Sequence, residues 1–421
     1  MKVSRSLNLV LMDQALVSGV NFLTGILLVH FLGIEGFGTF TLLSMVILLV
    51  AGFQSSAIIA PMMSIGGKLD AAEEQKYDAA VFIQQLLFSL ISAPLLGAGV
   101  LISTHVHPEW QISAYIPWLM LVTAANQLQE FFRRYFFNRS RPGLALVNDS
   151  ISYGGQILIL LLLAALKMSN VANTLWIMAV TSLLAVLVGW VQSPSFHLSR
   201  FHLDWRHIQS VFNRHRHVAN WLLASTLMNW LSGNYLLLAS AAILDTTALG
   251  VLKACQNMIA VTHVLFMALS NIIPVRTARL LHQEGLPAME RYWNKALWAG
   301  GGATVLLALP ALFFPSFTLR LIYGPAMAAY GGILFCYAWV YLFIFMVQML
   351  TFALRTLERP RPIFLGYLLT GCMSLASAGP LCRGWGLNGV IVGMLALNIV
   401  NCSVLWVGYL KGRRVYREMA A

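Results

Sequence analysis

Twelve long apolar runs, separated by short polar stretches, extend along the whole sequence. A helix that crosses the roughly 30 Å hydrocarbon core of a bilayer needs about 20 mostly apolar residues, and each run is long enough. The first six cover about residues 14–32, 38–62, 79–103, 113–137, 143–166 and 172–192, and the second six cover about residues 218–243, 247–275, 293–314, 328–351, 363–382 and 387–410. The pattern predicts an all-α integral membrane protein with twelve transmembrane helices.

Composition supports the same class. The chain has 421 residues, of which 59% are hydrophobic and 10% are charged, and its mean hydropathy is +0.74. A soluble protein carries about 25% charged residues, so this chain lacks the polar surface of a cytosolic enzyme, a secreted domain or a disordered protein. The net charge of +12 would suggest nucleic acid in a soluble protein. Here the basic residues lie in short clusters between apolar runs, so membrane topology explains them and no nucleic acid is expected.

The basic residues also predict the orientation of the spans. Of the 27 Lys and Arg residues, 23 lie in the termini and in the loops after even-numbered spans, three lie in the opposite loops, and Lys253 lies within a span. Basic residues are retained on the cytoplasmic side, so both termini are expected inside. The longest inner connection, residues 193–217, carries four Arg and five His. Its His spacings fit no metal motif, so we interpret it as a basic, membrane-facing linker that joins two halves rather than a pH sensor or metal site.

The cysteines and the N-terminal sequence add little chemistry. The five cysteines lie almost entirely within apolar runs, at positions 255, 336, 372, 382 and 402, with no CxxC or Cys/His ligand spacing. They predict small packing residues, no disulfide framework and no metal site. The N-terminal sequence MKVSRSLNLV runs into the first span without an AxA site, so no cleavable signal is expected.

The two halves of the chain repeat a pattern. Matched residues are Gly38 with Gly250, Pro61 with Pro274, Tyr77 with Tyr292, Tyr115 with Tyr330, and Arg141-Pro142 with Arg361-Pro362, at offsets that rise from 212 to 220. Both halves start inside, so the repeat is parallel, as in transporters built from two similar bundles around a central cavity. We therefore predict a six-helix lobe over residues 1–192, a linker over 193–217, and a second six-helix lobe with a short tail over 218–421.

Span eight carries polar side chains at bilayer depth, where such groups are costly and commonly face a cavity or a partner helix. Gln256, His263 and Ser270/Asn271 follow Lys253 by 3, 10 and 17 or 18 residues. In one continuous helix these positions fall within an arc of about 100°. Lys253 either faces a central cavity and contacts the substrate, or extends to the outer headgroups. His263 is either a substrate contact or a core histidine.

Spans one and seven carry similar polar rows. The candidate substrate-binding residues there are Ser18 and Asn21 in span one and Ser225 and Asn229 in span seven, at helical spacings of three or four. Small polar residues also let helices pack and form hydrogen bonds across their interfaces. Both interpretations, substrate contact and helix packing, stay open for these four residues.

Acidic residues near the inner ends of the spans suggest ion pairs. Glu130 precedes Arg133 and Arg134 by one helical turn, which favours a local ion pair. Asp149 lies about two turns into span five. It either pairs with an arginine of the 133–141 cluster or binds a proton or cation. Arg133 and Arg134 are also candidates for binding anionic headgroups at the inner leaflet.

Three stretches resemble a known family. They are NFLTGILLVHFLGIEGFGTF (Asn21–Phe40), FFRRYFFNRSRP (Phe131–Pro142) and ALGVLKACQNM (Ala248–Met258). They are similar to the polysaccharide and lipid-linked-oligosaccharide flippases of the MOP exporter superfamily, such as O-antigen or exopolysaccharide flippases. The turn LGIEGFG carries most of the likeness, because its glycines permit a tight connection between two helices.

This resemblance implies a transporter of the bacterial inner membrane. It implies two parallel six-helix lobes, with spans one, two, seven and eight around the cavity, and alternating access that moves a polyprenyl-pyrophosphate-linked oligosaccharide outward. Lys253 would then contact phosphate, and the Asn, Ser, Gln and His side chains would contact sugar. The expected partners are this substrate, membrane lipids and other polysaccharide-assembly proteins. No catalytic residue and no cofactor are expected.

Three other functions fit the sequence less well. An ion-coupled multidrug antiporter would be expected to show a pair of carboxylates within the membrane in one lobe, and Asp149 is the only candidate for such a carboxylate. A major-facilitator carrier is disfavoured because SIGGKLDAAEEQKYDAA, after span two, lacks the expected Gly-x-x-x-Asp-Arg signature. A glycan polymerase or ligase is disfavoured because no outer loop exceeds about a dozen residues. The absence of a GxxxxGK[ST] motif from the sequence excludes ATP hydrolysis at such a loop.

Overall fold

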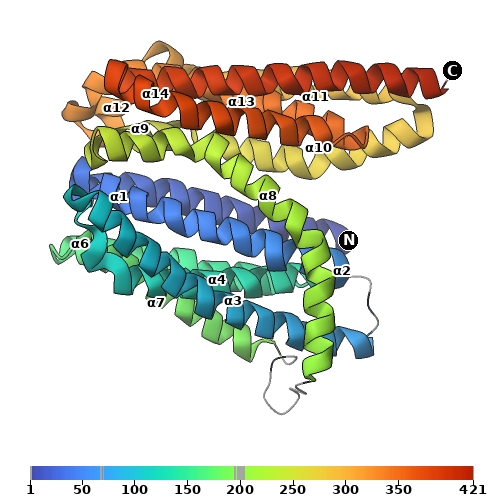
Figure 1. Ribbon diagram of the computed structural model, residues 1–421, viewed down its shortest axis with the longest axis horizontal. Coiled ribbons are helices and arrows are strands. Elements are labelled where there is room, and N and C mark those ends of the chain that lie inside the picture. The colour runs from blue at the N-terminus through green and yellow to red at the C-terminus, as the bar shows by residue number, and fades with distance from the viewer. Residues whose placement is uncertain (1, 67–68, 70, 194–195, 197–203, 421) are drawn as a thin grey trace. The chain divides into compact units, whose positions relative to one another are not determined.

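The computed structural model describes residues 2–66, 69, 71–193, 196 and 204–420, and nearly all of these residues are helical, with short turns between the helices (Figure 1). The main helices are α1 (Lys2–Gln54), α2 (Ala60–Ile65), α3 (Ala71–Val106), α4 (Ile116–Asn138), α5 (Pro142–Asp149), α6 (Gly155–Ala165), α7 (Val171–Val191), α8 (Trp205–Ile243), α9 (Thr246–Ile259), α10 (Thr262–Glu284), α11 (Leu286–Phe313), α12 (Pro315–Tyr323), α13 (Gly331–Thr356) and α14 (Arg361–Ala420). All five cysteines are free.

These helices confirm the twelve predicted spans. Eight helical stretches of the described residues are long and apolar enough to cross a membrane. The stretch that contains α1 and the stretch that contains α14 each hold two spans, because Gly33 (φ 70°) and Gly386 (φ 57°) leave the helical conformation and reverse the chain. The more polar helices α4 and α8 complete the twelve.

Packing divides the chain into two units. Unit 1 comprises Met1–Thr24 and Phe31–Leu227, and unit 2 comprises Gly25–His30 and Met228–Ala421. The boundary therefore lies inside α8, ten residues beyond the predicted start of the second lobe. The short piece of α1 at residues 25–30 groups with unit 2 because His30 Nε2 lies 2.7 Å from the carbonyl oxygen of Ile322.

The two halves share local backbone features at the offsets of the sequence repeat. Each half has a 3₁₀ turn that ends in tyrosine directly before its fourth span, a left-handed residue directly before its fifth span, and another left-handed residue after it. The three pairs are Tyr115 and Tyr330, Ser140 (φ 54°) and Glu358 (φ 56°), and Lys167 (φ 57°) and Gly386 (φ 57°). Their offsets are 215, 218 and 219. The backbone therefore supports an internal duplication.

Two spans of unit 1 contain a π-helical turn, one at η1 (Ser55–Ile59) and one at η5 (Ser150–Gly154). A π turn inserts one extra residue into an α-helix, and such turns occur often at functional sites. Each follows directly after a buried polar residue, Gln54 in the first case and Asp149 in the second. Gln54 donates hydrogen bonds to Gln85 Oε1 at 2.9 Å and to the carbonyl oxygen of Gln127 at 2.7 Å.

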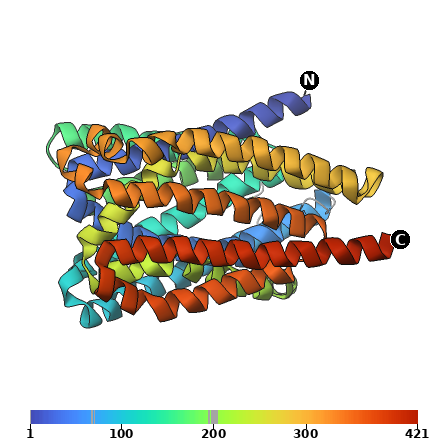
Figure 2. The same cartoon turned by 90° about the horizontal axis from the view of Figure 1, so that it is seen from above.

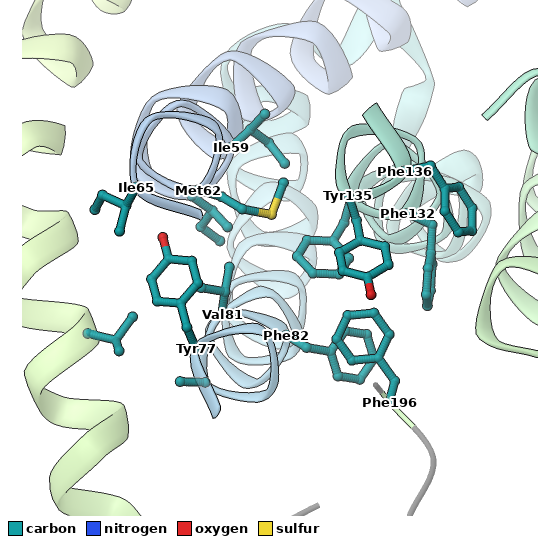
Figure 3. Close-up of a cluster of buried hydrophobic side chains, with 14 of the residues drawn as sticks. Ile59, Met62, Ile65, Tyr77, Val81, Phe82, Phe132, Tyr135, Phe136 and Phe196 are labelled. Carbon is teal, nitrogen blue, oxygen red and sulfur yellow. The ribbon is translucent and has the colours of Figure 1, made fainter. Parts of the chain in front are cut away.

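An aromatic cluster lies between α3 and α4 in unit 1 (Figure 3). Phe196 lies at its centre, with its ring centroid 4.9 Å from that of Phe82 and 4.8 Å from that of Tyr135. Tyr77, at the edge of the cluster, forms a 2.8 Å hydrogen bond with His215 of α8. The cluster thus fixes both α8 and the end of α7 to α3 and α4.

The predicted linker over residues 193–217 is partly helical. Residues 205–217 form the first part of α8, because Ile208, Val211 and His215 recur at helical spacing and are buried. The other linker residues 194–195 and 197–203, including Arg200, His197 and His202, lie outside the described residues.

Unit 2 is built around α13. This helix packs against α9, α10, α11 and α14, and Figure 2 shows α14 running beside it. Tyr337 and Tyr341 of α13 are almost completely buried, so the centre of unit 2 is apolar and aromatic. Polar side chains of α9 and α10 face this aromatic core at its edge.

Candidate functional site

The predicted eighth span is two helices rather than one. α9 ends at Ile259 and α10 begins at Thr262. The turn between them is 3₁₀-like, since the N–H of His263 donates to the carbonyl oxygen of Ala260 at 2.9 Å. Gln256 and His263 both lie at the hydroxyl of Tyr341, and His263 is close enough to Lys253 to interact with its charge. The turn therefore interrupts the predicted continuous helix but keeps His263 beside Lys253 and Gln256.

Lys253 and Gln256 form the polar centre of α9. Lys253 is half-buried, and its Nζ donates a 2.7 Å hydrogen bond to Gln256 Oε1. Within the part of the chain that the structure describes, no carboxylate forms an ion pair with Lys253. One turn further, Asn257 Nδ2 donates to the hydroxyl of Tyr323 at 3.3 Å. α9 therefore offers one cation supported by a neutral amide.

His263 lies at the start of α10. Its Nε2 is 3.2 Å from the hydroxyl of Tyr341, and the two rings pack edge to face with centroids 5.3 Å apart. The imidazole itself is exposed, so it is not a fully buried core histidine. Asn271, two turns along α10, and Asn229 on α8 are also exposed. These groups are hydrogen-bond donors and acceptors suited to hydroxyl or phosphate oxygens.

The predicted residues of unit 1 lie on α1 and α8. Asn21 is exposed, and Ser18 and Ser225 are half-buried. The polar contact between α8 and the second span is made by Thr226, next to Ser225, whose hydroxyl lies 2.7 Å from that of Ser56. A role of Ser18, Asn21 and Ser225 in substrate binding remains a prediction.

A buried charge cluster in unit 1 is centred on Arg133. Its guanidinium lies 3.1 Å from Asp13 Oδ2, 3.2 Å from Glu130 Oε2 and 2.6 Å from Asp149 Oδ2. Glu130 also pairs with Arg134 at 2.5 Å. These pairs confirm the predicted i,i+3 and i,i+4 contacts of Glu130. They also show that Asp149 pairs with an arginine, one of the two alternatives open for it.

Neutral side chains complete this Arg133 cluster. Gln129 Nε2 donates to Asp149 Oδ1 at 2.8 Å and to Asn148 Oδ1 at 3.0 Å, and Gln14 Nε2 donates to Asp13 Oδ2 at 3.1 Å. Asn148 in turn donates to the carbonyl oxygen of Ala185 on α7 at 2.7 Å. Gly189 permits this approach, because a Cβ there would lie 3.2 Å from Asn148 Nδ2.

The cluster holds three carboxylates and two guanidinium groups, so one negative charge is in excess when all are ionised. Asp13 Oδ1 is buried and accepts no hydrogen bond from the described residues. Such an arrangement is suited to taking up one proton or one monovalent cation. The expectation that only Asp149 could supply an acidic pair was wrong, because Asp13 lies on the same guanidinium.

Sequence reasoning did not connect Asp13, Gln129 and Asn148 with this cluster. Gln129 precedes Arg133 by four residues, which places both on one face of α4, and that spacing was the available signal. Asp13 is 120 residues from Arg133, and no local pattern joins them. A second arginine of the same region, Arg139, pairs with Glu74 and Asp78 of α3 rather than remaining free for headgroups.

No protein-family model matches the chain, and no curated protein matches its sequence. Solved structures do match its fold. An inward-facing multidrug resistance MATE family transporter of the MOP superfamily is 12% identical, with a TM-score of 0.73 over 97% of this chain and 95% of that chain. An outward-facing one is 13% identical, with a TM-score of 0.61 over 98% and 94%.

A third similar structure is a MOP superfamily transporter from Pyrococcus furiosus, described as having a binding pocket of reverse polarity that suggests a different function. It is 13% identical, with a TM-score of 0.66 over 99% of this chain and 95% of that chain. At this level of identity the likeness concerns the fold. The chain therefore has the twelve-helix, two-lobe fold of MATE family transporters of the MOP superfamily.

Proposed function

We propose that this chain is a multi-pass membrane transporter that works by alternating access and performs no covalent chemistry. The proposal is supported by fold similarity to transporters solved in both inward-facing and outward-facing conformations. Alternating access needs two bundles that can change their relative tilt around a substrate site. The two packing units and the internal repeat of this chain supply two such bundles. The positive-inside distribution supports cytoplasmic termini and an inner-membrane location.

For the substrate, we propose a lipid-linked oligosaccharide, flipped from the inner to the outer leaflet for cell-surface polysaccharide synthesis. The observation that carries this choice is Lys253, a cation of α9 that has a neutral amide and no carboxylate as its partner. A cation in this state attracts an anion and repels a cationic drug. Gln256, His263 and Asn271 then provide hydrogen bonds to sugar hydroxyls or phosphate oxygens.

A second candidate is an ion-coupled multidrug antiporter. The fold comparisons by themselves favour it, since two of the similar structures are described as multidrug resistance transporters. The excess carboxylate of the Arg133 cluster also favours it, because a site that gains and loses one proton or monovalent cation could couple transport to a gradient. In this candidate Asp149, Arg133 and Arg134 form the ion-linked site.

One experiment separates the candidates. The purified chain is reconstituted into vesicles, and flipping of a fluorescent polyprenyl-pyrophosphate disaccharide is compared with ethidium transport under a proton or sodium gradient. We expect the saccharide lipid to move, and Lys253→Ala to reduce its flipping by at least tenfold without lowering protein abundance. Lys253→Arg should keep part of the activity, because the charge remains while the geometry changes.

The matched control is Lys295→Ala, which removes an exposed lysine from the same unit. It should leave flipping unchanged. Ethidium transport that depends on a gradient, together with no movement of the saccharide lipid, would establish the second candidate. Normal flipping by a well-expressed Lys253→Ala variant would exclude the proposed role of Lys253.

A further inference from the structure

The first part of α8, residues 205–217, lies directly before a transmembrane span and runs across the ends of α2 and α3 rather than along them (Figure 1). We call it the α8 inner segment. It spans about 20 Å at 1.5 Å per residue, and because it crosses the helix ends directly before a predicted span, we expect it to lie near the bilayer surface. The basic loops on this side predict that this surface is the cytoplasmic one.

One face of the α8 inner segment packs against the other helices of unit 1. Ile208, Val211 and His215 are 7%, 5% and 2% exposed, and the two aliphatic side chains belong to the same buried cluster as Tyr77 and Val81. The hydrogen bond between His215 and Tyr77 adds a polar contact on this face. These contacts fix the rotation of the segment about its own axis.

The remaining face is aromatic and basic. Trp205 and Phe212 are 68% and 53% exposed, although they are large apolar side chains. Trp205, Phe212 and Arg216 lie at i, i+7 and i+11, within an arc of about 40°. Arg206 and Arg214 are also exposed, at about 100° and about 180° from Trp205 around the helix. In the described ranges, no carboxylate forms an ion pair with Arg206, Arg214 or Arg216.

We propose that the α8 inner segment binds the anionic phospholipids of the inner leaflet. Trp205 and Phe212 would lie at the boundary between headgroups and acyl chains, and Arg216 and Arg206, the arginines nearest to them around the helix, would bind lipid phosphates. Charge complementarity selects this occupant, because neither arginine forms an ion pair with a carboxylate of the described residues. A helix with aromatic residues beside arginines is typical of segments that lie in the membrane interface.

The test uses the full-length chain in lipid nanodiscs. The chain has 12 tryptophans, so the emission of Trp205 is obtained as the difference between the wild type and Trp205→Phe. Brominated phosphatidylglycerol and brominated phosphatidylcholine are then compared as quenchers in otherwise identical bilayers. We expect quenching of Trp205 by both lipids and stronger quenching by the anionic one. Added salt should weaken the preference, because exposed charges are screened.

Substitution of Arg206, Arg214 and Arg216 by Gln should reduce the anionic preference by about fivefold for each arginine that binds a headgroup. The matched control replaces three other exposed basic residues, Arg279, Arg291 and Arg361, by Gln. This control changes the net charge equally, and it should leave quenching of Trp205 unchanged. Added salt should weaken the preference of the wild type for the anionic lipid, and this tests headgroup binding without any substitution in the three arginines.

Three results would overturn the proposal. If neither brominated lipid quenches the emission of Trp205, this face contacts water or another protein. Equal quenching by both lipids, unchanged by salt and by the triple variant, would show apolar anchoring without headgroup binding. A preference that appears only after polyprenyl pyrophosphate is added would identify the transported lipid, rather than bulk phospholipid, as the occupant.

Discussion

At the residue scale, Arg133 and Arg134 are adjacent in the sequence but lie in different environments. The side chain of Arg133 is 6% exposed and faces three carboxylates, whereas that of Arg134 is 40% exposed and pairs with Glu130 alone. Removal of a buried charge leaves its partners unpaired, which commonly costs about 3–5 kcal/mol. An exposed pair contributes about 0–1 kcal/mol.

We therefore predict that Arg133→Ala lowers the free energy of unfolding by about 3–5 kcal/mol, while Arg134→Ala lowers it by less than about 1 kcal/mol. Thermal unfolding of both purified variants in the same detergent measures the difference. Asp149→Asn should partly restore Arg133→Ala, because it removes one unpaired negative charge. Equal melting temperatures for the two arginine variants would contradict the central position of Arg133.

His215 gives a prediction about pH. Burial, and to a smaller extent the nearby Arg214, lowers the pKa of His215 to about 4. The ordinary value in the unfolded chain is about 6.5, so the unfolded chain takes up a proton first as the pH falls. Stability is therefore complete above about pH 6.5, is lost as the pH falls toward 4, and is constant below that, with a total loss of about 3 kcal/mol.

This effect is measured by melting the wild type and His215→Gln between pH 4 and 8. Glutamine does not titrate and keeps a group that can bind the Tyr77 hydroxyl. The difference between the two melting curves should be flat above pH 6.5 and should fall below it. A difference that stays constant down to pH 4 would show that His215 does not contribute.

At the element scale, the hairpin between the first two spans depends on the backbone of Gly33. Its φ of 70° and ψ of 176° lie in a region that is almost restricted to glycine, where other residues cost about 1–3 kcal/mol. A Cβ at Gly33 would meet no atom within 4 Å, so the whole cost comes from the backbone.

We predict that Gly33→Ala destabilises the protein by about 1–3 kcal/mol. Gly19→Ala is the matched control, because Gly19 is helical in the same element and a Cβ there also meets no atom within 4 Å. It should be neutral or stabilising by about 0.5–1 kcal/mol. Thermal unfolding of the two variants compares them directly, and an equal effect would refute the role of the backbone.

Hydrophobic length predicted the spans well but not the breaks within them. The ends of α7 were predicted within a residue, since an apolar run must match the bilayer thickness. The break at Ala260–Val261 was not predicted, because it contains neither glycine nor proline. The π turn after Asp149 was not predicted either, since a single inserted residue leaves no trace in the hydrophobic pattern.

The candidate sites were predicted unevenly for a similar reason. Lys253 was identified because a single lysine within an apolar run is conspicuous, and its local contact with Gln256 follows from their spacing. The Arg133 cluster joins α1, α4 and α5, and only the fold brings these segments together. The helix over residues 205–217 was missed because its buried face is short and its many Arg and His residues resemble a solvated linker.

At the scale of the whole molecule, the topology remains a prediction from the basic residues. Gln209 is exposed on the α8 inner segment. In a variant without native cysteines, Gln209→Cys should react with a membrane-impermeant maleimide only after the cells are opened, because this segment is expected inside. Labelling of intact cells would reverse the orientation of the whole chain. Ser113→Cys, on the predicted outer side, is the control and should be labelled in intact cells.

α8 also has a mechanical consequence. It is helical from Trp205 to Ile243, yet its residues up to Leu227 pack with unit 1 and those from Met228 pack with unit 2. A hydrogen-bonded helix is stiff along its axis and does not stretch. Any change in tilt between the units must therefore bend α8 or move its inner end. A spin label at Gln209, on the exposed side of the first part of this helix, would report such a movement.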